Sequence, residues 1–248
     1  MQNLTISLIT VVYNAQNTID TCIQSVLRQK FNNIQFIIID GGSTDDTLKI
    51  INNYREHIQI LISEPDNGIY DAMNKGIQLA TGDIIGTLNA DDYLADENVL
   101  NDVAMAFASH QIDILYADLD FIEPNGTVVR KWRSGDYKSG MFNGGWMPPH
   151  PTFYCKKELF EILGSYKLDY GSAADYELML RFIHLNKKKV FYLERVIIKM
   201  FVGGVSNKSI GNRVKALGND LKAMRNNDIL FPIISLILKP LRKIMQFF

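Results

Sequence analysis

The first part of this 248-residue chain, to about residue 110, alternates between apolar, β-branched runs and segments with helical spacing. The strand-like runs are 4–12, 36–39, 59–62 and 83–88. The helix-like segments between them are 18–27, 45–54 and 69–80. Strands with so few polar residues are typical of sheets buried on both faces. The alternation predicts βαβ units, hence an α/β domain whose mostly parallel central sheet is flanked by helices.

The pattern becomes irregular after residue 92. It predicts helices near 97–108 and 174–185, strands near 112–116 and 190–193, a hairpin over 121–129 and an ordered loop over 134–150. The hairpin is expected because Pro124-Asn125-Gly126 is a strong turn signal. We therefore expect one domain over 1–226, with a front half of about 1–110 and a second half of about 111–226.

The C-terminal tail, 227–248, differs in kind from the domain. From Ile229 onward it is rich in apolar residues, carries three basic residues and has no acid. Because Pro232 and Pro240 should break it, a spanning helix is not expected. An apolar, basic, amphipathic segment predicts binding to a membrane surface. The alternative is a helix docked on the domain or on a partner subunit.

Composition excludes several classes of protein. With a net charge of −1, the chain lacks the basic excess of a general nucleic-acid binder. Cys22 and Cys155 lie in apolar surroundings without CxxC spacing, so we expect no disulfide framework and a cytoplasmic location. The N-terminus has no basic region preceding an apolar run, and no signal peptide is expected.

Two adjacent acids, Asp91 and Asp92, follow the apolar run 83–88. Neighbouring carboxylates at the exit of a buried strand repel each other and are costly to desolvate, so packing alone does not favour them. A divalent cation would relieve the repulsion, because hard cations take carboxylate oxygens. The pair therefore predicts a metal site for a phosphorylated ligand.

Asp40 ends the second strand-like run and begins Asp40-Gly-Gly-Ser-Thr-Asp-Asp-Thr47. Ligands of open α/β sheets bind at the carboxyl ends of the strands, so Asp40 is a candidate ligand contact. Ser43 with Asp46 fits a capping box on the next helix. No GxGxxG follows the first strand, which argues against a dehydrogenase.

Three further segments carry candidate polar residues. Asp66 lies in the run Pro65-Asp-Asn-Gly68, which is sufficient to explain a turn by itself. Asp71 lies in the helix that follows, where a solvated face explains it as well as ligand contact does. Asp175 opens a helix and is a candidate general base; Glu177 lies on a different face of that helix. His150, in a proline-rich loop, either packs or lines an acceptor or metal site.

The ordered motifs resemble those of inverting family-2 glycosyltransferases. The matching segments are Thr10-Val-Val-Tyr-Asn14, Asp40-Gly-Gly-Ser-Thr-Asp45, Asn89-Ala-Asp-Asp92 and Ala173-Ala-Asp175. The resemblance implies the GT-A fold, a nucleotide-sugar donor, UDP-linked by preference, and Mg²⁺ or Mn²⁺ bound at a DxD motif. On this resemblance Asp40 contacts the nucleobase, Thr10 and Tyr13 line its pocket, and Asn89 holds the first position of the DxD-like motif. Asp66 and Asp71 are further candidates for the donor site, taken from their own segment and not from the resemblance. Asp91 is then the metal ligand, and Asp175 the catalytic base.

The resemblance implies transfer of a sugar from a nucleotide diphosphate to an acceptor hydroxyl. Together with the tail, it predicts a lipid-linked or glycan acceptor in surface polysaccharide or lipopolysaccharide assembly at the inner face of the cell membrane. The sequence departs from the family pattern at Asn89, Gly41 and Ala174, positions where acids are common. These departures motivate a non-catalytic nucleotide-sugar-binding or scaffolding subunit as an alternative. A nucleotidyltransferase is a second alternative, although Asn14-Ala-Gln-Asn17 is neither basic nor glycine-rich.

Overall fold

A computed structural model describes residues 4–202 and 210–247 of the chain. Its strands are β1 (Ile6–Val12), β2 (Ile34–Asp40), β3 (Ile60–Ser63), β4 (Ile84–Asn89), β5 (Asp92–Leu94), β6 (Ile114–Ile122), β7 (Val128–Trp132), β8 (Tyr154–Lys156) and β9 (Val190–Phe201). Its α-helices are α1 (Ile19–Leu27), α2 (Thr47–Asn52), α3 (Ile69–Leu79), α4 (Val99–Ser109), α5 (Glu158–Leu163), α6 (Ala174–Met179), α7 (Ile210–Asn226) and α8 (Pro232–Arg242).

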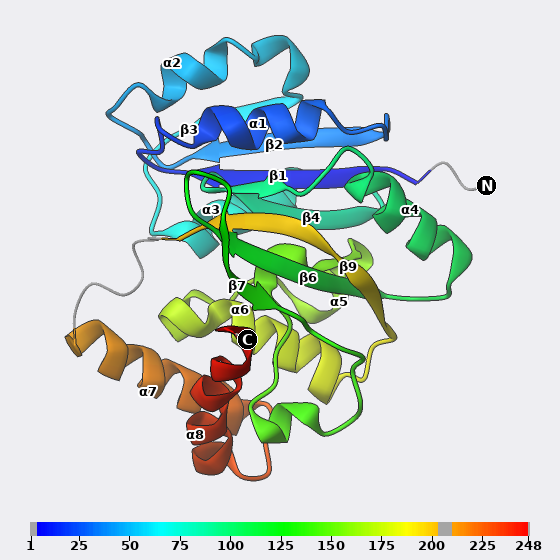
Figure 1. The fold of residues 1–248 in the computed structure, drawn as a ribbon, viewed down its shortest axis with the longest axis vertical. Coiled ribbons are helices and arrows are strands. Elements are labelled where there is room, and N and C mark those ends of the chain that lie inside the picture. The colour runs from blue at the N-terminus through cyan, green and yellow to red at the C-terminus, as the bar shows by residue number, and fades with distance from the viewer. Residues whose placement is uncertain (1–3, 203–209, 248) are drawn as a thin grey trace.

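The strands form one mixed sheet in the order β3-β2-β1-β4-β8-β6-β9-β5, with β7 paired to β6 (Figure 1). β3, β2, β1 and β4 run parallel, and so do β6 and β9. β8 joins the two groups as an antiparallel strand between β4 and β6. The predicted α/β architecture with a mostly parallel sheet is confirmed, and the turn at 123–127 joins β6 to β7 as the expected hairpin.

Helices cover both faces of the sheet, and each face has its own hydrophobic core. Along β1, Leu8 and Val12 belong to the core shared with α1 and α4, whereas Ile9 and Val11 belong to the core shared with α3 and α6. This alternation follows from the two-residue period of a strand. In Figure 1, α1 and α2 lie at the end of the molecule opposite α7 and α8.

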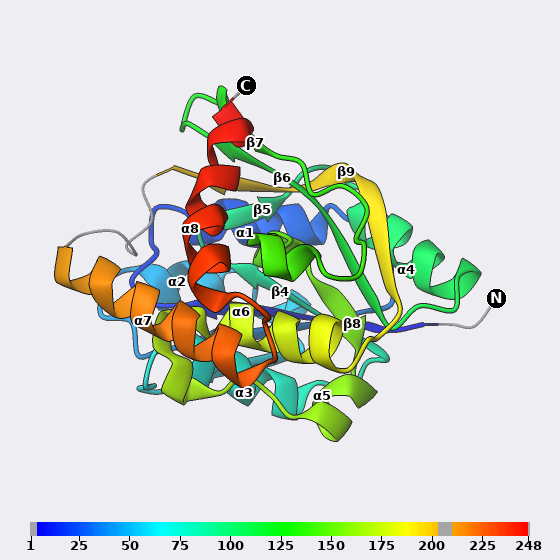
Figure 2. The same ribbon diagram turned by 90° about the horizontal axis from the view of Figure 1, so that it is seen from below.

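The tail forms helix α8, which packs against α7 and the short helix η2 (Met141–Gly144). The hydroxyl of Ser235 donates to the carbonyl oxygen of Asn143 at 2.6 Å, and Lys239 pairs with Asp220 at 2.8 Å. Figure 2 shows α8 passing along η2 toward β7. The tail is thus docked on the domain. The two prolines do not interrupt α8, because Pro232 occupies its first turn and Pro240 lies inside it.

No helix in the described ranges is both long enough and apolar enough to cross a membrane.

Candidate functional site

The strand ends that carry the sequence motifs meet at one edge of the sheet. In the parallel register Val12 lies opposite Asp40, and Val11 lies opposite Asn89. The carboxyl ends of β1, β2 and β4 are therefore neighbours, as the ligand-binding edge of an open α/β sheet requires. Tyr13 follows β1 directly and is 63% exposed, so its ring is available to a ligand at this edge.

Asp40 is fully buried at this edge and organises the loop after β2. Its carboxylate accepts hydrogen bonds from the hydroxyls of Ser43 and Ser63, the latter at 2.7 Å, and from the backbone N–H of Ser43 at 3.1 Å. The expected capping box between Ser43 and Asp46 is therefore not formed. Instead, the carboxylate of Asp45 accepts from the N–H of Thr47 at 3.0 Å. Contact between Asp40 and a nucleobase stays a prediction.

Thr10 lies away from the exposed edge. Its side chain is fully buried on the face of β1 that packs against α1, and its hydroxyl lies 3.9 Å from the sulfur of Cys22. Thr10 therefore presents no exposed atom to a ligand in this structure. Its predicted place in the nucleobase pocket receives no support from the geometry.

Asp66 and Asp71 shape the loop that leads into α3. Asp66 accepts from the N–H of Gly68 at 2.7 Å, and Asp71 accepts from the N–H of Asn67 at 2.9 Å. A Cβ atom on Gly41 would lie only 2.5 Å from a carboxylate oxygen of Asp66. Gly41 is therefore the residue that allows the side chain of Asp66 to reach the end of β2.

The end of β4 places unsatisfied oxygen atoms next to Asp91. The amide of Asn89 donates to Asp92 at 3.0 Å, but Oδ1 of Asn89 and Oδ1 of Asp92 are buried without a hydrogen-bond partner in the described structure. Burial raises the pKa of Asp91, and burial followed by the charge of Asp91 holds the pKa of Asp92 well above the usual range. A hard cation would satisfy such oxygens and stabilise the charged carboxylates.

The oxygens of Asn89, Asp91 and Asp92 are therefore chemically suited to bind Mg²⁺ or Mn²⁺, but they are too few to complete the coordination of the metal. Within the described ranges, no group of three or more histidine, cysteine or acidic side chains is arranged to hold a metal. Asp91, with oxygens from Asn89 or Asp92, would leave further positions for ligand phosphates and water. This division of ligands is usual for Mg²⁺ at nucleotide sites.

Asp175 lies half-buried in the first turn of α6, where its Oδ1 accepts from the N–H of Tyr176 at 2.7 Å. The side chain of Tyr70, from the first turn of α3, lies beside this carboxylate. Burial, and then the charge of Asp175, hold the pKa of Tyr70 well above its usual range. Tyr70 thus stays neutral beside the carboxylate.

Tyr166 connects Asp175 to β4. Its ring lies 5.3 Å from the ring of Tyr70, and its hydroxyl lies 2.7 Å from Nε2 of His150 and close to the side chain of Thr87 in β4. Burial lowers the pKa of His150, an effect that the charge of Asp175 opposes. His150 is therefore a packed, hydrogen-bonded neighbour of the proposed base. Sequence reasoning missed Tyr70, Thr87 and Tyr166, because neither spacing nor charge marks them.

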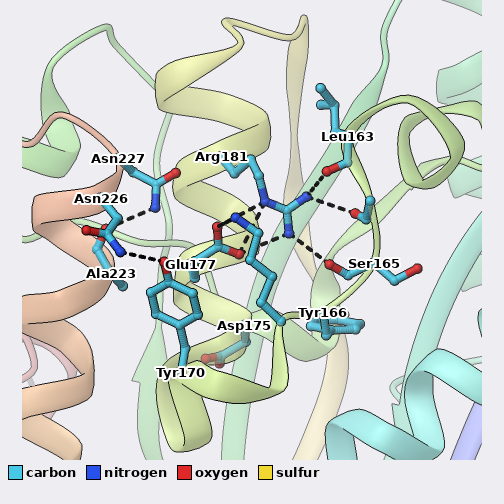
Figure 3. A network of polar contacts seen from close by, with 12 residues as sticks. Leu163, Ser165, Tyr166, Tyr170, Asp175, Glu177, Arg181, Ala223, Asn226 and Asn227 are labelled. Carbon is cyan, nitrogen blue, oxygen red and sulfur yellow. Dashed lines mark hydrogen bonds and ion pairs between the residues drawn. The ribbon is translucent and has the colours of Figure 1, made fainter.

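A buried ion pair supports the segment that carries Tyr166 (Figure 3). Glu177 is fully buried and accepts three hydrogen bonds from Arg181, whose guanidinium also donates to the carbonyl oxygens of residues 163, 164 and 165. Lys167 completes the group at 3.1 Å from Glu177. With all its partners inside the protein, Glu177 is not available as a base, as its different helix face predicted.

Comparisons with known proteins agree on one family. The model described as "Glycosyl transferase family 2" matches residues 7–165. The PGL/p-HBAD biosynthesis glycosyltransferase of Mycobacterium bovis (strain BCG / Pasteur 1173P2) is 30% identical over 207 residues, which cover 81% of this chain and 78% of that protein.

Solved structures share the fold at low sequence identity. S. aureus TarS 1-349 in complex with UDP-GlcNAc superposes with a TM-score of 0.70 at 17% identity, covering 95% of this chain and 70% of that one. The mannosyltransferase PcManGT from Pyrobaculum calidifontis, in complex with GDP-Man and Mn²⁺, superposes with a TM-score of 0.69 at 16% identity, covering 96% and 72%. The chain spans 39% of the longer TarS structure.

Proposed function

Because the chain belongs to glycosyl transferase family 2, and is thus a glycosyltransferase that uses a nucleotide-sugar donor, we propose that it is a metal-dependent, inverting enzyme. The observation that carries this proposal is the meeting of two motifs at one edge of the sheet. Asn89 ends β4 and Asp91 follows two residues later, and Asp175 is connected to that strand through Tyr70 and Tyr166.

Asp91 would hold the metal, with Asn89 or Asp92 supplying further oxygen. When bound, the cation would neutralise charge on the diphosphate leaving group. Two buried oxygens that have no hydrogen-bond partner among the described residues, one on Asn89 and one on Asp92, support this assignment. The exposed ring of Tyr13 and the loop from Asp66 to Asp71 would contact the rest of the donor.

Asp175 would accept the proton of the acceptor hydroxyl as that oxygen attacks the anomeric carbon from the face opposite the leaving group. The hydrogen bond from the N–H of Tyr176 holds its carboxylate in place, and Tyr70 lies beside it. General-base catalysis typically contributes about 10²–10⁴-fold to the rate. Alignment of donor and acceptor by the protein contributes about as much or more.

The donor is proposed to be a UDP-sugar. TarS, which has this fold, is described in complex with UDP-GlcNAc, whereas PcManGT is described with GDP-Man. Binding and slow hydrolysis of UDP-, GDP- and dTDP-sugars, each with Mn²⁺, Mg²⁺ or EDTA, would test the choice. Binding of one donor that EDTA abolishes is the expected result. Failure of the folded protein to bind any of them with metal present would refute the proposal and favour the scaffolding subunit.

Two substitutions separate donor binding from chemistry. Asp91→Ala should abolish the metal-dependent part of donor binding. Asp175→Asn should keep donor binding and lower the transfer rate by about 10²-fold or more. Matched controls are Asp83→Asn at the other end of β4 and Asp169→Asn, exposed just before α6; both should act as wild type. Normal transfer by Asp175→Asn would place the base elsewhere.

We further propose that the acceptor is lipid-linked and that the tail contacts the inner face of the cell membrane. Docking of α8 leaves its other side uncovered by the described protein, with Leu230, Phe231, Ile233, Ile237 and Leu241 each more than half exposed. A helix with such a face lies at a membrane interface with its apolar side chains in the acyl region.

Vesicle flotation tests the tail without removing the docked helix. The triple variant Ile233→Gln/Ile237→Gln/Leu241→Gln should bind phosphatidylcholine–phosphatidylglycerol vesicles at least about tenfold more weakly, because each lost apolar contact costs about 1 kcal/mol. The control Met105→Gln/Ile162→Gln/Val214→Gln removes exposed apolar side chains elsewhere and should float like wild type. Equal flotation of both triple variants would exclude α8 as the membrane contact.

A further inference from the structure

A concave pocket of about 290 Å³ lies between α8, the end of β7 and the loop around η2. We call it the tail pocket. Its lining residues are Lys131, Trp132, Arg133, Ser134, Met141, Gly145, Trp146, Met147, Lys239, Arg242, Lys243 and Gln246. They include five cations and not one carboxylate, in a protein whose net charge is −1.

Part of this positive charge lacks an ionic partner. Arg133 pairs with Asp120 at 2.7 Å, and Lys239 pairs with Asp220. Lys131, Arg242 and Lys243, by contrast, have no ion pair with any described residue. Desolvation, and then the like charges of Lys239 and Arg130, lower the pKa of Lys243. An anion in the tail pocket would offset this repulsion.

The walls of the tail pocket are held in place by specific contacts and are not formed by loosely placed surface side chains. Gly145 has a φ of +74°, and a Cβ atom there would lie 2.5 Å from the backbone nitrogen of Lys239, so α8 can approach closely because this residue is glycine. The indole N–H of Trp146 donates to the carbonyl oxygen of Ser134 at 3.0 Å. Arg242 is held by a 2.7 Å hydrogen bond from its Nε to the carbonyl oxygen of Gly144. These contacts fix the walls that carry the cations.

Compensation of the helix dipole explains only part of the cluster. Lys239, Arg242 and Lys243 lie at the C-terminal end of α8, where cations are favourable. Lys131 and Arg133 come from β7 and the residue after it, more than a hundred positions earlier in the chain. Both α8 and β7 thus place positive charge in the same pocket. The dipole of α8 does not explain the cations that come from β7.

One residue of the tail pocket, Lys239, contacts the neighbour of the proposed base. The ammonium group of Lys239 lies 3.7 Å from the ring centre of Tyr176, and the N–H of Tyr176 donates to Asp175. The same helix carries the exposed apolar side chains on its outer side. An amphiphile with a phosphate in this pocket would therefore have its head group near Asp175 and its hydrocarbon along α8.

We propose that the tail pocket binds the phosphate or diphosphate group of the lipid-linked acceptor through Lys131, Arg242 and Lys243. This inference rests on the proposed function, because it assumes that the acceptor is lipid-linked. Arginine and lysine are the side chains that form charge-assisted hydrogen bonds with phosphate oxygens.

The test measures binding of farnesyl diphosphate, farnesol and inorganic pyrophosphate to the full chain. EDTA is present, so that binding through a divalent metal at Asp91 is not counted. Wild type should prefer farnesyl diphosphate to either other probe. Lys131→Gln/Arg242→Gln/Lys243→Gln should bind it at least about tenfold more weakly, the effect of losing one charged hydrogen bond. Equal binding by wild type and this variant would overturn the proposal.

The matched control is Arg28→Gln/Lys49→Gln/Lys187→Gln, which removes the same charge from the residue after α1, from α2 and from the turn before β9. It should stay within about twofold of wild type, as expected for exposed charges. A second arm uses phosphatidylglycerol vesicles. Loss of vesicle binding with retained farnesyl diphosphate binding would assign the cations to phospholipid head groups and overturn the proposal.

Measuring hydrolysis of the sugar donor distinguishes a failure of the tail-pocket proposal from a failure of the proposed glycosyltransferase function. The pocket variant should hydrolyse the UDP-sugar at the wild-type rate, since its substitutions lie outside the donor site. Absence of donor hydrolysis in wild type would count against the proposed function, whereas farnesyl diphosphate binding would still report on the pocket.

Discussion

The buried pair of Glu177 and Arg181 gives the sharpest prediction on stability. Their side chains are 0% and 7% exposed, and the guanidinium holds three consecutive carbonyl oxygens as well as the carboxylate. Arg181→Met keeps most of the apolar stem but leaves Glu177 with Lys167 as its remaining cation. Breaking a buried pair in this way costs about 3–5 kcal/mol. Because Lys167 remains, we expect about 3 kcal/mol.

Urea unfolding followed by circular dichroism measures this cost. With a slope of about 2–3 kcal/mol per molar urea, the midpoint should fall by about 1 M. Glu177→Gln should also destabilise, because it leaves Arg181 buried without its counter-charge. The double variant Glu177→Gln/Arg181→Met should cost clearly less than the sum of the single substitutions, with a coupling of about 2 kcal/mol.

An exposed pair on the same part of the protein serves as the control. Lys222 and Asp169 are 42% and 63% exposed, so Lys222→Met should cost less than about 1 kcal/mol. A cost below about 1 kcal/mol for Arg181→Met as well would refute the reasoning. It would mean that water reaches Glu177 and that the three carbonyls do not depend on the guanidinium.

Three further perturbations test other parts of the structure. Gly145→Ala should push α8 off the domain and destabilise the protein by at least about 2 kcal/mol, because it combines strain at positive φ with a backbone clash; faster proteolysis within the tail would report it. Since burial lowers the pKa of His150, the unfolded chain binds the extra proton, so stability should fall as pH drops below about 6.5, by at most about 1.4 kcal/mol per pH unit. His150→Gln should flatten that dependence in urea titrations from pH 7 to 5. Gly41→Ala should displace Asp66 and weaken donor binding at a stability cost below about 1.5 kcal/mol, measured by calorimetry and urea unfolding.

The front half of the fold could be predicted because its information is local. The run 4–12 became β1, and the helical spacing of 69–80 became α3, within a few residues at each end. Strands buried on both faces show as unbroken apolar runs, and the βαβ rule then restricts the topology.

The missed elements depend on tertiary pairing. β5 and β8 are three residues each and exist because β9 and β4 offer them hydrogen bonds. β9 was expected to end at residue 193 but continues to Phe201 along β6. Helix α7 is largely polar, and its buried contacts are concentrated at Ala223 and Met224, so its sequence carries little periodic signal.

The residues of the candidate site also fall into those that could be predicted from the sequence and those that could not. Asp40, Asn89 and Asp91 could be predicted because they end strands, and Asp175 because it opens a helix. The tyrosines around Asp175 could not, since Tyr70 and Tyr166 lie 96 residues apart and meet only in the folded chain. The tail pocket likewise joins β7 to α8, a separation over which sequence spacing carries no information.

Two of the departures from the family pattern follow from packing in this chain. Ala174 is fully buried in the core, where an acid would be desolvated without a partner. At position 41, any side chain would press on Asp66.

The third departure, Asn89, keeps an oxygen free for a cation while its amide holds Asp92. A scaffolding subunit that never bound metal would gain nothing from two adjacent, desolvated acids at the end of β4, whose pKa values burial raises. Asp91→Asn/Asp92→Asn should therefore stabilise the metal-free protein while it abolishes metal-dependent donor binding. Loss of stability in EDTA would instead assign the acids to the fold, and urea midpoints with and without Mn²⁺ distinguish the two results.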